Sequence, residues 1–336
     1  MKALRLLKHV GEDDSLEGAF EVADIPTPKP RSGQVLVKIM RAPINPSDLS
    51  TMSGSYNSAQ REALPAQLGY EASGVVVAAG GGIFARRLLG KRVAIASKRG
   101  GVTYAQYALA PALSTIVLPD DVSFEEGCSC FVNPLTVIGF LETARTHKAR
   151  TIVHTAAGSM LGKMLIKLGQ EWGINVIGVV RREAHVAELK GLGAVEVIVT
   201  ANDGWEEDLK AACESHGASV AFDAVAGPGT GALLRYMPAK STVYVYGGLS
   251  RQHCGDVRPT DLIFRKSKLL GWWLTPYLTS KSLLGQAAML RTVTKNLKSS
   301  LATDVRAVHP LSDAVKAVTD YQTNMSGGKV VFSPNI

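Results

Sequence analysis

A glycine-containing loop between a strand-like segment and a helix-like segment is the first part of the chain whose residues suggest chemistry. Residues 156–162 read Ala-Ala-Gly-Ser-Met-Leu-Gly. Glycines at such a junction let the backbone approach a pyrophosphate, and the following helix offers free N–H groups and the positive end of its dipole. The pattern is Gly-x-x-x-Gly, with Met160 in place of the usual middle glycine. On its own, therefore, the loop also fits a plain strand-to-helix turn.

The end of the next predicted strand carries a pair of positive charges. Residues 175–180 read as a strand, and Arg181 and Arg182 follow it directly. Sites that prefer NAD usually place an acidic residue here for the ribose 2′-hydroxyl, whereas guanidinium groups bind a 2′-phosphate through forked, charge-assisted hydrogen bonds. No acidic residue precedes Glu183 at this strand end. The sequence therefore predicts NADPH as the cofactor, and it leaves open that one of the two arginines is merely solvated.

Small residues at the ends of two later predicted strands leave room for a flat ligand. These segments are 222–227 and 246–249. In parallel sheets, ligands bind in the crevice at the carboxyl ends of the strands. We expect 246–249 to lie beside the nicotinamide or its ribose, and we interpret Asp223 and His154 as structural residues.

The positions of these segments require an α/β sheet, and the pattern from about residue 150 onward provides one. Four strand–helix units in series with short connections indicate a parallel, doubly wound Rossmann sheet. The predicted strands are 151–154, 175–180, 195–199, 220–224 and 242–246, and the predicted helices between them are 162–172, 183–192 and 205–215.

The first third of the chain has a different texture and is expected to form a mostly β domain. Short valine-rich runs alternate there with glycine and proline. A helical pattern and a strand after the last Rossmann strand indicate that the chain returns to this first domain. We therefore expect a nucleotide-binding domain of residues 125–268 inserted in a catalytic domain of residues 1–124 and 269–336. The segments behind this prediction are 35–39, 74–77, 283–297 and 329–332.

Composition argues against several classes of function. The net charge is +8, and residues 72–119 lack acidic residues while basic ones gather between Arg86 and Arg99. No aromatic interleaving or nucleic-acid motif accompanies them, so we favour a solvated basic face. The four cysteines show neither disulfide nor zinc spacing. With no targeting segment visible and no apolar run of the ~18 residues that a membrane span needs, we expect a cytoplasmic protein without nucleic-acid or membrane partners.

Several segments together resemble the medium-chain dehydrogenase/reductase superfamily over essentially the whole chain. They are 43–48, 68–74, 132–136, the glycine loop and Gly247-Gly248. The resemblance implies a GroES-like catalytic domain around the inserted Rossmann domain. Zinc alcohol dehydrogenases of this superfamily have a cysteine where this chain has Asn45 and a histidine where it has Tyr70, and their four-cysteine lobe is missing. Catalytic zinc takes three ligands from Cys, His and carboxylates, so we expect no metal.

Within the zinc-free branch the chain is most similar to the 2-enoyl thioester reductases of mitochondrial type. The similarity rests on Asn-Pro-Ser-Asp followed by Gly54-Ser55-Tyr56, an Asn-Pro-x-Thr helix start at Asn133, a segment from Phe264 to Leu274, and Lys329. The chain departs from this family at Met160 and at 137–139. Quinone oxidoreductases of the superfamily also carry Gly-x-Tyr near this position, so Tyr56 supports the zinc-free branch more than it supports one substrate.

The resemblance implies a role for each matching residue. Tyr56 becomes the catalytic tyrosine, and a homodimer that pairs near 268–274 is expected because relatives commonly pair there. We expect only one of two adjacent tryptophans to face a ligand, since neighbours on a strand point to opposite faces. The implied NADPH contacts are Asn133, Gly158, Ser159, Met160, Leu161, Arg181, Arg182, Tyr246, Gly247, Gly248, Leu249, Trp272, Trp273, Leu274, Thr275 and Lys329, and the implied substrate pocket holds Asn45, Thr136 and Phe264.

The predicted reaction is reduction of the activated C=C of a 2-enoyl thioester. Hydride addition to C3 leaves enolate charge on the carbonyl oxygen, which needs a hydrogen-bond donor, and C2 needs a proton. Tyr56 in a Gly/Ser-rich segment (53–58) suits either task, although it can also be an ordinary exposed tyrosine. The alternatives are an NADPH:quinone or α,β-unsaturated carbonyl reductase and, more remotely, a non-enzymatic NADPH- or RNA-binding protein supported only by the basic stretch.

Overall fold

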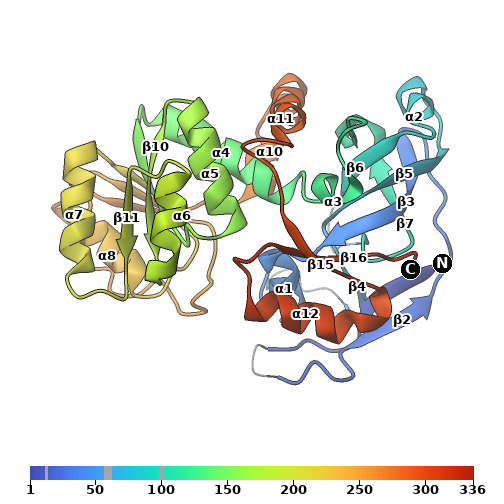
Figure 1. Ribbon diagram of the computed structural model, residues 1–336, viewed down its shortest axis with the longest axis horizontal. Helices are drawn as coiled ribbons and strands as arrows, with labels where there is room; N and C mark the ends of the chain where they lie inside the picture. The colour runs from blue at the N-terminus through green and yellow to red at the C-terminus, as the bar shows by residue number, and fades with distance from the viewer. Residues whose placement is uncertain (12–13, 57–62, 98–101) are drawn as a thin grey trace. The chain divides into compact units, whose positions relative to one another are not determined.

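The computed structural model describes residues 1–11, 14–56, 63–97 and 102–336 (Figure 1). Within it the chain forms two compact units. Unit 1 comprises Met1–Val132 and Leu290–Ile336, and unit 2 comprises Asn133–Met289. The second unit is thus an insertion in the first.

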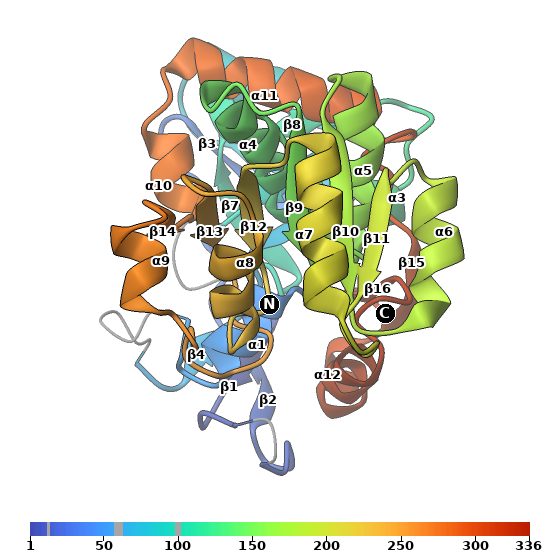
Figure 2. The ribbon, with the colours of Figure 1, turned by 90° about the vertical axis from the view of Figure 1, so that its left-hand side faces the viewer.

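Unit 2 is built on a six-stranded parallel sheet with the strand order β11-β10-β9-β12-β13-β14. The helices α7 and α8 cover one face of this sheet, and α4 and α5 lie on the other (Figure 2). The fold class predicted from the sequence is therefore confirmed. The strands are β9 (Thr151–Thr155), β10 (Asn175–Val180), β11 (Glu196–Val199), β12 (Val220–Asp223), β13 (Thr242–Val245) and β14 (Lys268–Gly271). The helices are α4 (Val132–Thr146), α5 (Met160–Glu171), α6 (Val186–Gly191), α7 (Trp205–His216), α8 (Gly229–Tyr236), α9 (Pro259–Ile263), α10 (Leu274–Thr279) and α11 (Leu283–Asn296), which continues into unit 1.

The sequence of unit 2 explains why its strands are central. All five residues of β9 are buried, and in β10 every residue after Asn175 is buried. A continuous apolar run of this kind is typical of parallel strands that are covered by helices on both faces. The helix α7 has three acidic residues in its first turn and ends at Gly217, whose φ of 64° is the left-handed conformation that closes many helices.

Unit 1 is a β domain with a seven-stranded sheet and a three-stranded sheet. The larger sheet has the order β15-β16-β3-β5-β6-β8, with β7 also paired to β3, and the smaller has the order β2-β1-β4. The strands are β1 (Lys2–Leu6), β2 (Phe20–Asp24), β3 (Gln34–Pro43), β4 (Ala66–Gln67), β5 (Glu71–Ala79), β6 (Arg92–Ala96), β7 (Tyr107–Pro111), β8 (Ile116–Val117), β15 (Val305–His309) and β16 (Lys329–Phe332). The helices are α1 (Pro46–Met52), α2 (Ile83–Arg87), α3 (Phe124–Gly127) and α12 (Ala314–Thr323).

The late strand β16 joins the two parts of unit 1. It pairs antiparallel with β3, with Val331 opposite Pro43 and Phe332 opposite Ala42. One apolar core then takes side chains from the early strands and from β16 and α12, including Leu4, Ile39, Val318 and Phe332. The chain's return to its first domain follows from this burial of late apolar residues.

The unit bounds differ from the domain bounds that we expected at 125 and 268. The first difference arises because 125–132 stays with unit 1 up to the start of α4. The second arises because β14 pairs parallel with β13 and is followed by Trp272, which packs on α4. Trp272 is 8% exposed and Trp273 is 47% exposed. One ring is thus inside and one outside, although both residues follow the end of β14 at Gly271.

Trp272 fits against α4 because residue 139 is a glycine. A Cβ at Gly139 would lie 2.6 Å from the Trp272 ring. The indole is held on its other sides by an edge contact with Phe140 at 4.7 Å between ring centres and by the Nε1–H bond to Thr143 Oγ1 at 3.2 Å. The ring therefore has little room to move away.

We predict that Gly139→Ala destabilises the protein by about 1–3 kcal/mol, because overpacking outweighs the gain in helix propensity of ~1 kcal/mol. Gly191→Ala is the matched control: Gly191 lies in α6, and its added Cβ would have no neighbour within 4 Å. Urea unfolding followed by circular dichroism measures both variants. Equal stability of Gly139→Ala and the wild type would contradict the packing described.

Candidate functional site

The turn after β9 is shaped to bring backbone N–H groups to the start of α5. Ser159 caps this helix by accepting a hydrogen bond from the Gly162 N–H at 3.2 Å. A Cβ at Gly162 would lie 2.3 Å from the Ala157 carbonyl oxygen, so only glycine lets the turn pack this closely on the helix. Met160 and Leu161 are buried, so at these two positions only the backbone is offered to a ligand.

A histidine packs against this turn, with two basic side chains near it. A Cβ at Gly158 would lie 3.0 Å from the His185 ring. Burial and the neighbouring charges of Arg182 and Lys163 hold the pKa of His185 below its usual value. Lys163 forms an ion pair with Glu188 at 2.6 Å. The sequence pointed to Arg181 and Arg182 but missed Lys163 and His185, whose closeness to the turn depends on how α5 and the segment after β10 pack.

The paired arginines stand at the end of β10, as predicted. Both side chains are exposed. In the described part of the chain no acidic side chain forms an ion pair with either of them. Two guanidinium groups without an internal carboxylate partner are available for an anionic ligand.

The ends of β9, β12 and β13 lie together at one edge of the sheet. Asp223 is buried there and accepts hydrogen bonds from the Thr155 hydroxyl at 2.8 Å, the Thr230 hydroxyl at 2.8 Å and the Val225 N–H at 2.9 Å. These contacts fix the loop after β12. Asp223 is thus a structural residue in this arrangement, in agreement with the interpretation drawn from the sequence.

The segment 246–249 reaches the same edge, but it offers less than its sequence suggests. The Tyr246 hydroxyl is hydrogen-bonded to His154 Nε2 at 2.8 Å, and its ring meets Phe140 edge-on. Burial lowers the pKa of His154 to about 3, so this histidine is a neutral partner. The Tyr246 side chain is therefore engaged inside unit 2. A Cβ at Gly247 would lie 2.7 Å from the Ala224 carbonyl oxygen, whereas Gly248 is open and Leu249 is 43% exposed.

The other predicted residues of unit 2 are spread along the chain. Asn133 and Thr136 are buried in the first turns of α4, which begins at Val132, so Asn133 does not cap the helix. Phe264 follows α9 and is 77% exposed. Trp273 precedes α10, and Leu274 and Thr275 form its first turn. The roles of these residues as ligand contacts stay predictions.

Unit 1 holds a buried polar cluster, which we define as Asn45, Asp48, Glu71 and Lys329. The Asn45 amide donates to Glu71 Oε1 at 3.0 Å, and its carbonyl oxygen accepts from the Lys329 ammonium. Lys329 Nζ also donates to the Ile44 carbonyl oxygen at 3.3 Å. The four side chains are nearly inaccessible to solvent. Buried charges of this kind are stable only when they are paired and hydrogen-bonded.

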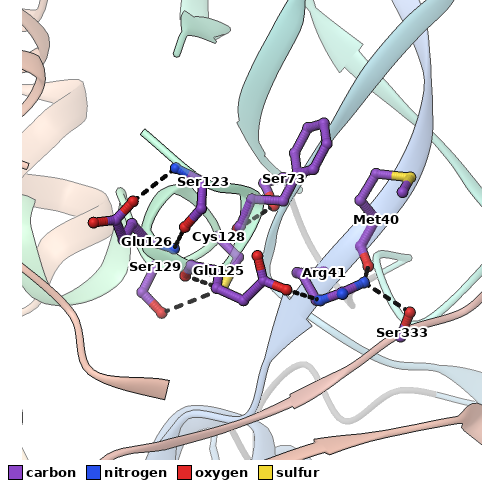
Figure 3. Close-up of polar contacts among 10 residues, drawn as sticks. Met40, Arg41, Ser73, Ser123, Glu125, Glu126, Cys128, Ser129 and Ser333 are labelled. Atoms are coloured by element: carbon purple, nitrogen blue, oxygen red, sulfur yellow. Dashed lines mark hydrogen bonds and ion pairs between the residues drawn. The ribbon is translucent and has the colours of Figure 1, made fainter. Parts of the chain in front are cut away.

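Backbone N–H groups complete the surroundings of Glu71. Its Oε2 accepts from the Phe131 N–H at 2.8 Å and the Val132 N–H at 3.0 Å. The segment before Phe131 is anchored by an ion pair of Arg41 with Glu125 at 2.7 Å and by the Ser73 hydroxyl on the Phe124 carbonyl oxygen at 2.6 Å. Figure 3 shows how Arg41 also reaches Ser333 from the same position.

The cluster contains two carboxyl groups and one ammonium group, and burial governs all three. Burial raises the pKa of Asp48 to about 7, although the Asn45 N–H and the Lys329 charge act against this. Burial also raises the pKa of Glu71 and lowers that of Lys329. The Lys329 side chain, expected to meet NADPH, is thus engaged inside unit 1. Asn45, expected in the substrate pocket, has both ends of its amide bound within the cluster.

The helix α1 connects this cluster to Tyr56. The helix begins after Asn45, whose N–H donates to Asp48 Oδ2 at 2.8 Å. At its other end the Tyr56 N–H donates to the Ser50 carbonyl oxygen at 3.0 Å. The Tyr56 side chain is 39% exposed, and its ring centre is 5.5 Å from that of Tyr70. The last two residues of the predicted 53–58 segment lie outside the described residues.

Among the described residues, no cluster of three or more His, Cys, Asp or Glu side chains is arranged to hold a metal ion. The helices that the structure describes include none with the length and apolarity for crossing a membrane. All four cysteines are free, and burial raises the pKa of Cys128 to about 12.

Known families match both units. Residues 31–120 match the Alcohol dehydrogenase GroES-like domain family, and residues 161–287 match the Zinc-binding dehydrogenase family. The mitochondrial enoyl-[acyl-carrier-protein] reductase of Xenopus tropicalis is 30% identical over 315 residues, which are 90% of this chain and 88% of that protein. The enzyme of the same name from Arabidopsis thaliana is 28% identical and matches 80% of this chain and 72% of its own length.

Solved structures agree over almost the full length. A putative NADPH:quinone reductase from Mesorhizobium loti has a TM-score of 0.89 and 31% identity, covering 99% of this chain and 98% of its own. The quinone oxidoreductase of Escherichia coli, solved with NADPH, has a TM-score of 0.86 at 21% identity, covers 99% of this chain and 100% of its own, and shows the fold alone. The chain belongs to the medium-chain dehydrogenase/reductase superfamily. It is an oxidoreductase that uses a nicotinamide cofactor.

Asp48 gives the cluster a dependence on pH that can be measured. Because the folded protein keeps a proton on Asp48 that the unfolded chain releases above about pH 4, this group stabilises the fold most at low pH, and the stabilisation is lost as the pH rises toward 7. Asp48→Asn cannot titrate but can still accept the Asn45 N–H. We predict that the free energy of unfolding falls less steeply between about pH 4.5 and 7.5 in Asp48→Asn than in the wild type. Urea titrations across this range measure it, and parallel curves would refute the assignment.

Proposed function

We propose that the protein is an NADPH-dependent, zinc-independent reductase that transfers hydride to the activated C=C of a 2-enoyl thioester. The observation that carries the proposal is the exposed Arg181–Arg182 pair at the end of β10, next to His185, which packs against the turn at Gly158. The names of the curated relatives support the thioester as substrate.

The residues of unit 2 fit the cofactor in three parts. The N–H groups of Gly158, Met160 and Leu161 would bind the pyrophosphate, whereas those of Ala157, Ser159 and Gly162 are already donated within the turn. Arg181 and Arg182 would hold the 2′-phosphate through charge-assisted hydrogen bonds. The open backbone at Gly248 supports a place for the nicotinamide half. When bound, NADPH supplies the hydride.

Tyr56 would serve the charge that develops on the substrate. Enolate charge on the thioester oxygen is stabilised by a donor that is already in position. A phenol with an ordinary pKa of about 10 is a neutral donor near pH 7. The Tyr56 side chain is part-exposed and its backbone is tied to Ser50, so the hydroxyl can reach a ligand from a fixed base. We assign it the hydrogen bond to the thioester oxygen or the proton for C2.

The residues at the expected metal positions do not fit zinc. Asn45 presents an amide whose two ends bind Glu71 and Lys329, and Tyr70 presents a phenol bound to Thr51 at 2.6 Å. The positive charge next to Glu71 comes from the Lys329 ammonium. We therefore derive no step through a metal ion.

A quinone or α,β-unsaturated carbonyl reductase is the second candidate. The likeness to the Mesorhizobium loti structure, which is described as a putative NADPH:quinone reductase, favours it specifically. Non-enzymatic RNA binding has less support. Arg86, Arg87 and Lys91 are exposed, but Arg92 is turned to the carbonyl oxygens of Asp120 and Val122 and lies over the Phe124 ring. Lys98 and Arg99 lie outside the described residues.

A cytoplasmic homodimer remains part of the proposal. The strand β14 is at the edge of the six-stranded sheet. Ile263, Phe264 and Leu270 are exposed on and just before it. An open strand edge with apolar side chains is suited to pairing with a second copy.

The cofactor proposal predicts a selective loss of affinity. In the Arg181→Ala/Arg182→Ala double variant, the Kd for NADPH should rise about 10- to 100-fold, since charge-assisted hydrogen bonds to the 2′-phosphate are lost. The Kd for NADH should change little. Arg150→Ala is the matched control, because Arg150 is also exposed but lies before β9, at the opposite end of the strands. Fluorescence titration measures both ligands, and an equal loss for NADH and NADPH would refute 2′-phosphate binding.

The proposed role of Tyr56 predicts a loss of turnover. In Tyr56→Phe, kcat with a crotonyl or hexenoyl thioester should fall about 100-fold, as is typical when a positioned proton donor is removed. The Kd for NADPH should stay the same because unit 2 is unaltered. The same assay with quinones separates the two candidate substrates, and a chelator should leave every rate unchanged. Undiminished thioester reduction by Tyr56→Phe would rule the role out.

A further inference from the structure

Tyr70 lies beside Tyr56 and is held both at its backbone and at its hydroxyl. It directly precedes Glu71, whose side chain is held by Asn45 and by the N–H groups of Phe131 and Val132. The Tyr70 carbonyl oxygen accepts from the Ser97 N–H at 2.7 Å. The backbone at Tyr70 is therefore fixed from both sides.

The hydroxyl of Tyr70 is fixed as well. It lies 2.6 Å from Thr51 Oγ1 on α1. The Thr51 hydroxyl lies 2.9 Å from the Ser47 carbonyl oxygen and donates to it. A threonine hydroxyl has one hydrogen atom. Because that hydrogen is used on Ser47, Tyr70 is the donor in its bond to Thr51. Its ring is thus held at the backbone end and at the hydroxyl end.

The Tyr56 ring packs against the Tyr70 ring. The two ring centres are 5.5 Å apart and the ring planes are inclined by 52°, which is within the range of favourable aromatic pairs. Beyond this contact the Tyr56 side chain is 39% exposed. A ring that packs against a fixed neighbour keeps fewer rotamers, and this narrows the positions open to its hydroxyl.

We propose that Tyr70 is a positioning residue, which holds the Tyr56 ring in one orientation and so fixes where the Tyr56 hydroxyl meets the substrate's carbonyl oxygen. The inference rests on the proposed function of Tyr56. The Tyr70 ring provides a packing surface for the Tyr56 ring. The hydrogen bond to Thr51 fixes Tyr70 to α1, the helix that precedes Tyr56. Tyr56, through its backbone N–H, and Tyr70, through its hydroxyl, are thus both hydrogen-bonded to α1, so their relative orientation is set within unit 1.

The experiment is a double-mutant cycle with NADPH and an enoyl thioester. In the wild-type background, Tyr70→Ala should lower kcat about tenfold with little change in KM, because a misplaced donor loses transition-state stabilisation. In the Tyr56→Phe background the same change should cost less than about twofold, since the hydroxyl that Tyr70 positions is already absent. A structural role alone would give the same loss in both backgrounds.

Conservative variants test the hydrogen bond between Tyr70 and Thr51. Tyr70→Phe keeps the aromatic ring and should retain most of the activity that Tyr70→Ala loses, with a fall in kcat of about threefold. Thr51→Val should give the same fall in kcat, and the Tyr70→Phe/Thr51→Val double variant should show no larger fall than either single variant. Tyr236→Ala is the control for a lost ring elsewhere: it removes a part-buried tyrosine from α8 and should lower Tm without lowering kcat at 25 °C.

The outcomes are distinguishable. An unchanged kcat in Tyr56→Phe would overturn the proposed role of Tyr56 and the inference with it. A large loss in Tyr56→Phe, combined with equal losses for Tyr70→Ala in both backgrounds, would overturn the inference alone. An unchanged kcat in Tyr70→Ala would do the same.

Discussion

The buried ammonium of Lys329 is the interaction around which unit 1 is organised. Its partners come from the segment before α1, which carries Ile44 and Asn45, and from Glu71 at the start of β5. This cation thus compensates the Glu71 carboxylate, which would be costly to bury alone, while burial keeps a proton on Asp48 up to about pH 7. The arrangement also explains why α1 begins where it does, since Asn45 takes part in the cluster and its N–H is capped by Asp48. Tyr56 follows α1, which begins after Asn45, and Tyr70 directly precedes Glu71, so the cluster fixes the chain close to both tyrosines.

Unit 2 depends on a different constraint, which is the lack of space at the ends of its strands. Gly158, Gly162 and Gly247 each lie where an added Cβ would meet another part of the unit at 3.0 Å or less. The side chains in this region turn inward: Asp223 closes a loop, and Tyr246 pairs with His154. What remains outward is backbone and the two arginines. A site of this composition binds through N–H groups and charge, which suits a dinucleotide.

Much of the fold could be predicted from the sequence because its signals are local. The alternation of apolar strands with helices predicted the parallel sheet, and the predicted strand at 175–180 coincides with β10. The compact unit extends beyond the predicted domain boundary at 268, because β14 pairs with β13 and Trp272 fits against Gly139, and both contacts are distant in sequence. The strand β15 and the helix α12 were not predicted. In β15 the more and less exposed residues alternate, but the apolar Val308 is on the exposed side and His309 is buried, so the residue types do not reveal the strand.

The candidate site could be predicted less completely, because many of its contacts join residues that are distant in sequence. The arginine pair follows its strand directly, so local pattern was sufficient. Resemblance indicated Lys329 as a cofactor contact, but its partners lie across the fold and engage its side chain within unit 1. His185 gave no signal in the sequence, because its closeness to Gly158 arises only when the segment after β10 folds back beside the turn.

The separation of Lys329 from Asn45 along the chain has a consequence for biosynthesis. The two residues are 284 positions apart, and all of unit 2 lies between them. A ribosome therefore completes the inserted unit, which ends at Met289, before it makes the lysine that neutralises Glu71. Until then the early part of unit 1 carries buried-to-be carboxyl groups without their counterion and β3 without its partner β16. The nascent chain should thus acquire an ordered nucleotide-binding unit first, and its first domain only after the last strand emerges.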